Sequence, residues 1–239
     1  MIIHVYPNAK TLAQAAATLL AAQITGKPGS VLGLATGSSP VATYQELIRL
    51  FQEKAVDFSQ ATTFNLDEYV SLPISHPCSY HAFMQVQLFD HVNFKASNLP
   101  DGNAKDLNRE CRRYDAAIQR AGGIDLQLLG IGRNGHIGFN EPADSFSAGT
   151  QIVNLTDSTI QANKRFFPSE REVPRQAISM GIGTIMSARK IMLLATGEDK
   201  AEAVRGMVKG NVTPRLPASI LHFHHRVTLL LDEGAASKI

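Results

Sequence analysis

The stretch GIGRNGHIGFNEP, residues 130–142, surrounds a histidine with glycines and ends in a glutamate followed by proline. It continues the apolar run IDLQLLGIG, which is typical of a strand buried in a parallel sheet. In open α/β sheets ligands bind beyond the carboxyl ends of strands, where glycines permit close backbone approach. His136 and Glu141 are therefore candidate acid–base residues at such an edge. The alternative is a tight turn in which His136 only caps local carbonyl groups.

A second candidate site lies in VLGLATGSSPVATY, residues 31–44, where a buried strand ends at a polar turn and Pro40 opens a helix. Such a turn offers backbone N–H groups and hydroxyls to an anion, here from Thr36, Gly37, Ser38 and Ser39. The Gly-Lys-Ser/Thr ending of a nucleotide-binding loop does not follow, which favours a sugar phosphate over a nucleotide. The alternative is a capped helix without a ligand.

A third candidate is TTFNLDEYV, residues 62–70, in which a strand ends in two adjacent carboxylates. Neighbouring residues on a strand face opposite ways, so Asp67 and Glu68 are not expected to meet the same substrate atom. A partly desolvated aspartate can remove a proton from carbon, which makes one of the two a candidate base. The alternative is a pair of solvated acids at a strand end.

Apolar runs that alternate with helical patterns surround these motifs and predict a mostly parallel sheet with crossover helices. Helices are expected around residues 12–24, from Pro40 onward and after Glu198, and the segment 71–103 is expected to form surface helices and loops. No linker marks a boundary, so we expect one domain over residues 1–239. The expected strands are IIHVY, VLGLAT, ATTFNL, LQLLGIG, KIMLLATG and VTLLLDE.

The composition excludes several classes of protein. With 44% apolar and 18% charged residues the 239-residue chain is neither disordered nor fibrous, and a net charge of +2 does not indicate a polyanion partner. Cys78 and Cys111 suggest neither a disulfide framework nor a zinc site, which favours reducing cytosol. The N-terminal segment lacks the basic start of a signal peptide, and no stretch is long enough to span a bilayer.

LHFHHRV contains His222 and His224 at a spacing that would put both on one face of a strand, with His225 beside them. Two such histidines could bind a metal, but no Asp, Glu or Cys nearby completes a set of ligands. We therefore expect packing, or a role near the floor of the site.

The motifs GLATGSSP, FNLDEYV, GIGRNGHIGFNEP, NKRFFPS and ATGEDKA resemble, in order and spacing, those of the glucosamine-6-phosphate deaminase (isomerase) family. The resemblance runs through most of the chain. It implies a Rossmann-like α/β fold with helices on both faces of the sheet. It also implies conversion of glucosamine 6-phosphate and water to fructose 6-phosphate and ammonia, without metal or organic cofactor. The expected setting is a cytoplasmic monomer or small homo-oligomer with no nucleic-acid or membrane partner.

The same resemblance assigns expected catalytic roles. Asp67 matches the base that moves a proton from C2 to C1, His136 matches the group that opens the sugar ring, and Glu141 matches the carboxylate that orients it. Some relatives carry aspartate where this chain has Asn134. A neutral amide can orient His136 but cannot favour its protonation as a carboxylate would, so Glu141 is expected to be the carboxylate partner.

The resemblance also places the Thr36–Ser39 turn, Arg165 and Lys200 around the 6-phosphate. A planar guanidinium, a compact ammonium and the neutral donors of the turn suit such a group. Taken singly, either cation could be an ordinary solvated charge.

Two other functions share features with this chain. A 6-phosphogluconolactonase also binds a sugar phosphate, but that family lacks LDEYV and the FNEP ending seen here. A non-enzymatic sugar-phosphate sensor would carry a helix-turn-helix segment, whereas residues 1–30 are expected to lead straight into the core.

The resemblance also leads to an expectation about effectors. Allosteric members of the family bind N-acetylglucosamine 6-phosphate with a basic pair after GFNEP and extend beyond the final strand; here GTQIVNLT offers Gln151 and Val153, and the chain stops soon after VTLLLDE. Each missing charge-assisted contact is worth about 1.5–3 kcal/mol. A ligand that hardly binds cannot shift an equilibrium between two states. We expect hyperbolic kinetics in glucosamine 6-phosphate that the acetylated sugar leaves unchanged apart from weak competition; sigmoidal rates that it makes hyperbolic would contradict this.

Overall fold

A computed structural model describes residues 1–239 apart from the side chain of Ala162. The described chain builds a seven-stranded sheet in which every pair of neighbouring strands is parallel. Its strands are β1 (Ile2–Tyr6), β2 (Val31–Leu34), β3 (Thr62–Asn65), β5 (Ala96–Asn98), β6 (Leu126–Gly130), β9 (Ile191–Ala195) and β10 (Val227–Asp232). Their order across the sheet is β1-β10-β9-β6-β2-β3-β5.

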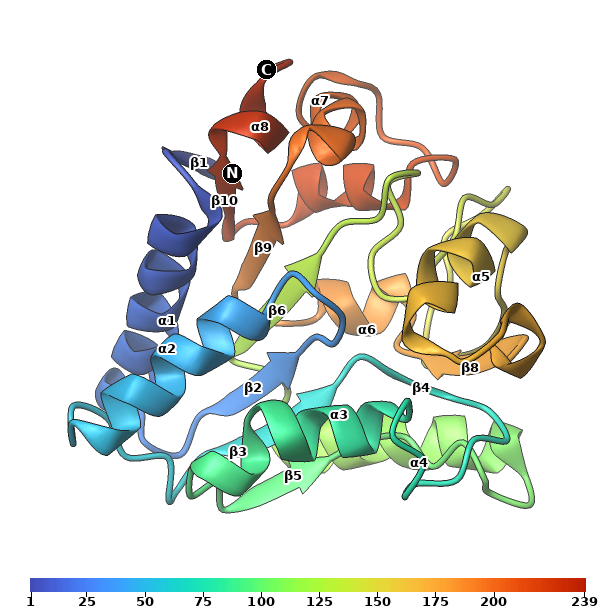
Figure 1. The fold of residues 1–239 in the computed structure, drawn as a ribbon, viewed down its shortest axis with the longest axis horizontal. Helices are drawn as coiled ribbons and strands as arrows, with labels where there is room; N and C mark the ends of the chain where they lie inside the picture. Colours follow the sequence, from blue (N-terminus) through green and yellow to red (C-terminus); the bar gives the residue numbers. More distant parts are fainter.

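Helices cover both faces of this sheet (Figure 1). The α-helices are α1 (Ala9–Gly26), α2 (Val41–Gln52), α3 (Tyr80–Gln87), α4 (Leu107–Arg120), α5 (Asp157–Asn163), α6 (Ile182–Met186), α7 (Ala201–Lys209) and α8 (Glu233–Ala236). Short 3-10 helices are η1 (Phe89–His91), η2 (Lys164–Phe166), η3 (Glu170–Glu172), η4 (Glu198–Lys200) and η5 (Pro217–Phe223). No helix among the described residues is both long enough and apolar enough to cross a membrane.

Alternation along the strands divides the interior into two cores. Leu32 and Leu34 of β2 pack with residues of α1, α2 and α3 on one face, whereas Leu129 of β6 and Leu193 of β9 pack with α4, α6 and α7 on the other. All four leucines are fully buried, and each contributes about 1.5–3 kcal/mol relative to exposure. A strand buried on both faces reads as a continuous apolar run, which explains why these strands stood out in the sequence.

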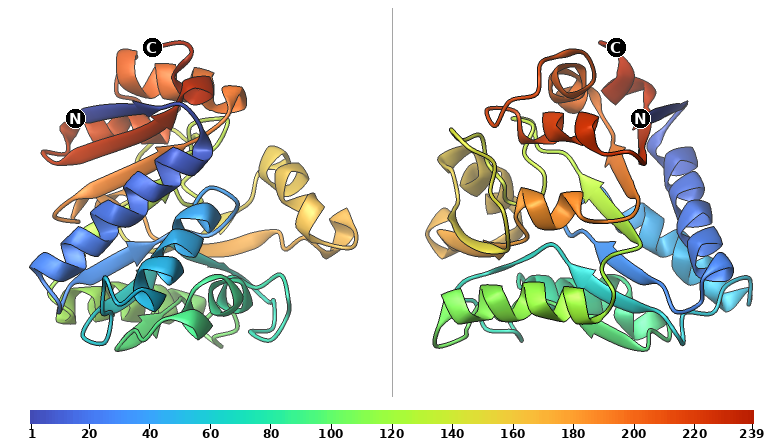
Figure 2. Two further views of the ribbon diagram at one scale, coloured as in Figure 1. Left: turned by 60° about the vertical axis from the view of Figure 1, so that its left-hand side comes forward. Right: turned by 180° about the vertical axis from the view of Figure 1, so that it is seen from behind.

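A second, antiparallel sheet lies beside the main one and was not predicted. It contains β4 (Asp67–Tyr69), β7 (Gln151–Asn154) and β8 (Gln176–Ser179), in the order β4-β8-β7. Figure 2 shows β8 and α5 standing out from the body of the molecule. Tyr69, Phe139 and Phe167 pack into a third apolar cluster there. The run FNLDEYV is therefore two strands, because the chain leaves the main sheet at Leu66 and joins the small one at Asp67.

The sequence predictions of the main elements are confirmed with small shifts. All six expected strands are present, and α1 starts before the expected residue 12 because Asn8 caps it, accepting a hydrogen bond of 3.0 Å from the backbone N of Thr11. The prediction for 71–103 was incomplete, because β5 forms within it at the sheet edge. Only three residues long and exposed at its start, β5 has too little apolar pattern to be recognised.

The topology marks one place on the sheet as special. From β2 the chain moves outward through β3 to β5, whereas from β6 it moves the opposite way through β9 to β10. The strand order therefore reverses between the neighbours β2 and β6. In open α/β sheets ligand sites form beyond the carboxyl ends of strands at such a switch point.

Candidate active site

The predicted site residues follow four neighbouring strands at one edge of the sheet. Thr36 follows β2, Asp67 follows β3, His136 follows β6 and Lys200 follows β9. These strands are adjacent in the order β9-β6-β2-β3. Because the carboxyl ends of parallel strands share an edge, residues far apart in the chain are gathered around the switch point.

Asp67 is a buried carboxyl group next to the polar turn after β2. Its residue is 5% exposed, and the hydroxyl of Thr36 lies 3.5 Å from its Oδ1. Burial raises the pKa of Asp67 to about 8; the neighbouring Glu68 carboxylate adds to the rise, and the Thr36 hydroxyl opposes it. The reading of Asp67 as a solvated strand-end acid is therefore wrong.

Glu68 is buried as well but serves a different purpose. Its carboxylate accepts hydrogen bonds of 2.8–2.9 Å from the backbone N–H groups of Tyr69, Tyr80 and His81. The last two begin α3, where a negative charge is stabilised by the free N–H groups of the helix. Burial raises the pKa of Glu68, and these three donors oppose the rise. The two carboxylates thus point to different partners, as the strand geometry predicted.

The glycine-rich loop after β6 packs directly against Asp67. Gly138 has φ +57°, and a Cβ at this position would lie 3.6 Å from Oδ2 of Asp67 and 3.2 Å from Oγ of Ser179. The backbone N of Phe139 donates to the same Ser179 oxygen at 3.1 Å. Ser179 is the register partner of Asp67 across β4 and β8. The loop and the carboxylate are therefore held at a fixed separation.

A second glycine of the loop makes room for the imidazole. A Cβ at Gly132 would lie 2.4 Å from Cε1 and Nε2 of His136, far inside contact distance. The side chain of His136 is 23% exposed, while its Nδ1 is fully buried and makes no hydrogen bond to the described residues. The exposed part of this side chain is thus not Nδ1.

Glu141 faces the buried nitrogen of His136. Its Oε2 lies 3.3 Å from His136 Nδ1 and accepts a 2.7 Å hydrogen bond from Nδ2 of Asn134. Its Oε1 accepts a hydrogen bond from the hydroxyl of Thr159 on α5. Burial would raise the pKa of Glu141, but the imidazole and the hydrogen-bond donors around the carboxylate outweigh burial and lower it to about 2.

Asn134 contacts both members of this pair, because its Oδ1 also accepts a 3.2 Å hydrogen bond from the backbone N of His136. The neutral amide therefore orients the histidine through its backbone and through Glu141 rather than through its ring. Thr159 was not identified from the sequence, since nothing in TDSTIQ separates it from the ordinary cap of a helix.

Cations gather at the turn after β2. Nη2 of Arg165 in η2 donates to Oγ of Ser38 at 3.3 Å, and its guanidinium lies 4.7 Å from the centroid of the Phe166 ring. The pKa of Lys200 is lowered by burial and by the charges of Arg133 and Arg165, while Asp199 opposes this. The two predicted cations are therefore close enough to repel each other.

Arg133 is a further cation of this cluster that the sequence analysis missed. Its Nε lies 2.8 Å from Oδ2 of Asp199, and that carboxylate lies 4.0 Å from Nζ of Lys200. Arg133 could have been recognised from the sequence, because it lies between two glycines of the motif GIGRNGH, which was already assigned to the site.

The predicted geometry of the histidine cluster was wrong. His222 belongs to η5 and His224 ends it, so the two do not share a strand face. Nε2 of His222 lies 2.6 Å from the carbonyl oxygen of Met207, and Nε2 of His224 lies 2.7 Å from that of Ala188. Both rings are thus hydrogen-bonded to backbone carbonyl groups, and of the two only His224 is buried. The part of the chain that the structure describes holds no group of three or more His, Cys, Asp or Glu arranged for a metal ion.

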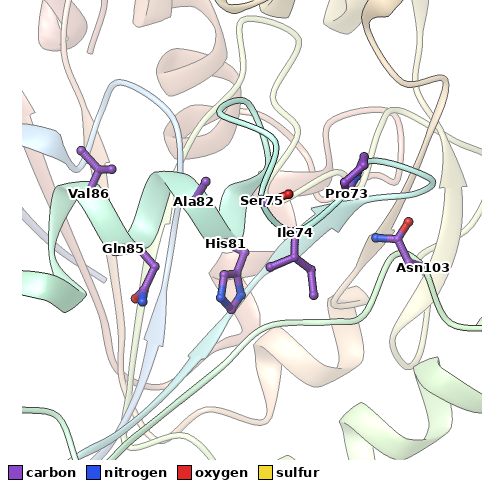
Figure 3. Close-up of a pocket in the computed structure, with 8 residues that line it drawn as sticks. All are labelled: Pro73, Ile74, Ser75, His81, Ala82, Gln85, Val86 and Asn103. Carbon is purple, nitrogen blue, oxygen red and sulfur yellow. The ribbon is translucent and has the colours of Figure 1, made fainter.

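An open hollow of about 700 Å³ lies beside α3 (Figure 3). His81, Gln85 and Val86 of α3 line one side, and Pro73 and Ile74 line the other. Its lining is mostly apolar and contains none of the residues predicted to act on a substrate. The candidate catalytic residues therefore lie at the switch point and not in this hollow.

Comparison with known proteins agrees with the fold and the motifs. Residues 7–230 match the family model described as glucosamine-6-phosphate isomerases/6-phosphogluconolactonase. A glucosamine-6-phosphate deaminase from Thermoanaerobacter sp. (strain X514) is 52% identical, over 100% of this chain and 95% of the relative. One from Clostridioides difficile (strain 630) is 54% identical, over 95% and 92%. A solved structure of a monomeric glucosamine-6-phosphate deaminase superposes with a TM-score of 0.97 at 48% identity, covering 100% of both chains. The chain therefore belongs to the glucosamine-6-phosphate isomerase/6-phosphogluconolactonase family.

Proposed function

We propose that this protein converts glucosamine 6-phosphate and water to fructose 6-phosphate and ammonia, as the names of its relatives suggest. One observation carries the proposal. Asp67, a buried carboxyl group, lies between the anion-binding turn, which it meets at Thr36, and the histidine loop, which it meets at Gly138. A carbon base, a phosphate site and an acid–base pair are thus within reach of one small sugar.

The first step opens the pyranose ring, which requires a proton to move from the C1 hydroxyl to the ring oxygen. Glu141, ionised because its pKa is low, faces Nδ1 of His136 and favours a proton on that nitrogen. The other ring nitrogen is then free to exchange a proton with the sugar. Asn134 holds the carboxylate and the histidine backbone in this arrangement.

The second step moves a proton between carbon atoms. Asp67 removes the C2 proton of the open aldehyde, and the electron pair of the broken C–H bond forms the C1–C2 double bond of an enolamine. The proton that the aldehyde oxygen gains comes from the substrate's own ammonium group, which becomes a neutral amine. Return of the proton to C1 leaves a C=N bond at C2. Water adds to this bond and ammonia leaves, which yields fructose 6-phosphate and makes the proposed enzyme a hydrolase.

The phosphate anchors the substrate during both steps. Thr36, Gly37, Ser38 and Ser39 directly precede Pro40 and the start of α2, where free N–H groups at the helix N-terminus can stabilise an anion. Arg165 and Lys200 supply the charge.

The same structure supports the proposal that the enzyme is not allosteric. Gln151 lies 3.5 Å from Asn140, and Val153 packs on the apolar cluster beneath the small sheet, so neither presents a cation to a phosphate.

We also assign the reaction to the cytoplasm, where free Cys78 and Cys111 suit a reducing setting. A monomer or small homo-oligomer suffices, since one solved relative is described as monomeric.

Replacing Asp67 tests the carbon base. Asp67→Asn should release ammonia from glucosamine 6-phosphate at least about a thousandfold more slowly, with binding little changed, because an amide cannot accept the proton. Incorporation of solvent deuterium at C1 should stop. Exposed Asp90→Asn is the matched control. Normal exchange in Asp67→Asn would transfer the role to Glu68, and hydrolysis of 6-phosphogluconolactone without ammonia release would favour the lactonase function.

The raised pKa of Asp67 predicts a pH dependence. Below about pH 8 the carboxyl group of the free enzyme is protonated, so kcat/KM should rise with pH and level off above about pH 8. The positive amino group of a bound substrate favours the carboxylate and should move the limb of kcat to lower pH. Thr36→Val removes a hydroxyl that lowers this pKa and should move the kcat/KM limb upward. A limb near the ordinary aspartate range, about pH 4, would contradict the assignment.

The phosphate contacts predict selective losses. Arg165→Ala or Lys200→Ala should weaken glucosamine 6-phosphate binding roughly tenfold to a hundredfold, because each removes a charge-assisted contact. The poor activity on unphosphorylated glucosamine should hardly change. Lys164→Ala, which removes the adjacent exposed cation that pairs with Glu170, is the control and should be neutral. An equal loss on both sugars would show that Arg165 and Lys200 support structure instead.

A further inference from the structure

Thr159 reaches Glu141 from a segment separate from the histidine loop. It lies on α5, is 4% exposed, and its hydroxyl donates to Oε1 of Glu141. The other oxygen, Oε2, is held by Asn134. The plane of the carboxylate that faces His136 is therefore fixed by two segments, the loop after β6 and α5.

The direction of the hydrogen bonds at Thr159 is determined. An ionised carboxylate can only accept, so the single proton of the Thr159 hydroxyl must go to Glu141. The hydroxyl oxygen in turn accepts from Oγ1 of Thr156 at 3.2 Å. Thr156 also caps α5, with its Oγ1 3.3 Å from the backbone N of Thr159. A β-branched side chain on a capped helix has few rotamers, which restricts the orientation in which the donor reaches Glu141.

The segment that carries Thr159 also contacts the Thr36–Ser39 turn after β2. This turn is called the phosphate turn below, because we propose that it binds the 6-phosphate. The chain passes from α5 straight into η2, where Arg165 donates to Ser38 at 3.3 Å. Figures 1 and 2 show α5 standing beside the sheet rather than in its body. Residues 156–166 thus touch Glu141 at one end and the phosphate turn at the other.

We propose that Thr159 is a positioning residue that links the seating of segment 156–166 on the phosphate turn to the orientation of Glu141 toward His136. The proposal rests on the proposed function. A 6-phosphate that binds Arg165 holds the segment in place, and the Thr159 hydroxyl then holds the carboxylate. The phosphate thereby assists ring opening as well as binding.

Thr159→Val removes the hydroxyl and keeps the shape of the side chain. We expect kcat for ammonia release to fall roughly tenfold to a hundredfold, as for loss of a hydrogen bond to a charged group. Binding of the open-chain alditol analogue of glucosamine 6-phosphate should change less than about twofold, because it needs no ring opening and keeps the phosphate contacts. Thr159→Ser keeps the donor and should restore most of the rate.

Thr184→Val is the matched control, because Thr184 donates to the carboxylate of Asp115 at 3.0 Å outside the site. It should leave kcat near the wild-type value. The link to the phosphate is tested in a double-mutant cycle with Arg165→Ala: the loss from Thr159→Val should be smaller when Arg165 is already absent. Strictly additive losses would overturn the link.

Equal kcat values for Thr159→Val and Thr184→Val would overturn the positioning role, as would a failure of Thr159→Ser to restore the rate. Parallel losses in alditol binding and in thermal stability would show a purely structural contribution and overturn it too. Absence of ammonia release from the wild-type protein would instead overturn the proposed function, so the two failures are distinguishable.

Discussion

The site depends on the burial of a carboxyl group that pairs with no cation among the described residues. Asp67 has only the Thr36 hydroxyl near its Oδ1, and burial raises its pKa to about 8. Ionising such a buried group costs free energy. In the free protein the carboxyl group therefore stays protonated at a pH where an exposed aspartate would be charged. The surrounding structure holds it in place: β4 pairs with β8, Glu68 anchors the start of α3, and Gly138 brings the loop against it.

The buried carboxyl group of Asp67 and the partly buried one of Glu141 have opposite pKa shifts, and the difference follows from their partners. Asp67 lies beside another carboxylate and few donors, whereas Glu141 lies beside an imidazole and accepts from Asn134 and Thr159. The first is therefore raised to about 8 and the second lowered to about 2. Environments that separate the pKa values of two like groups allow one to take up a proton while the other stays charged.

The parallel sheet could be predicted from the sequence, because its buried strands are continuous apolar runs. The position of the motifs at the carboxyl ends of these strands could also be predicted, because glycine-rich loops follow them. The contacts of Thr159 could not, since its partner lies 18 residues earlier in another segment and its local pattern is that of a helix cap. The small sheet was missed because β4 and β8 are short and pair across more than a hundred residues. His222 and His224 were misplaced because alternation was read as a strand where Pro217 opens a 3-10 helix.

Arg133, Arg165 and Lys200 form a cluster of cations at the end of the site where we propose that the phosphate binds. Lys200 is partly buried and has its pKa lowered by desolvation and by Arg133 and Arg165, with Asp199 as the opposing charge. Clustering cations in this way is unfavourable, and a dianionic phosphate among them reverses the sign of the interaction. Under the proposed function, the phosphorylated sugar supplies this negative charge and an unphosphorylated sugar does not. Arg165 belongs to the same segment as Thr159, which donates to the carboxylate that faces His136, so the proposed link would carry part of this stabilisation to that carboxylate.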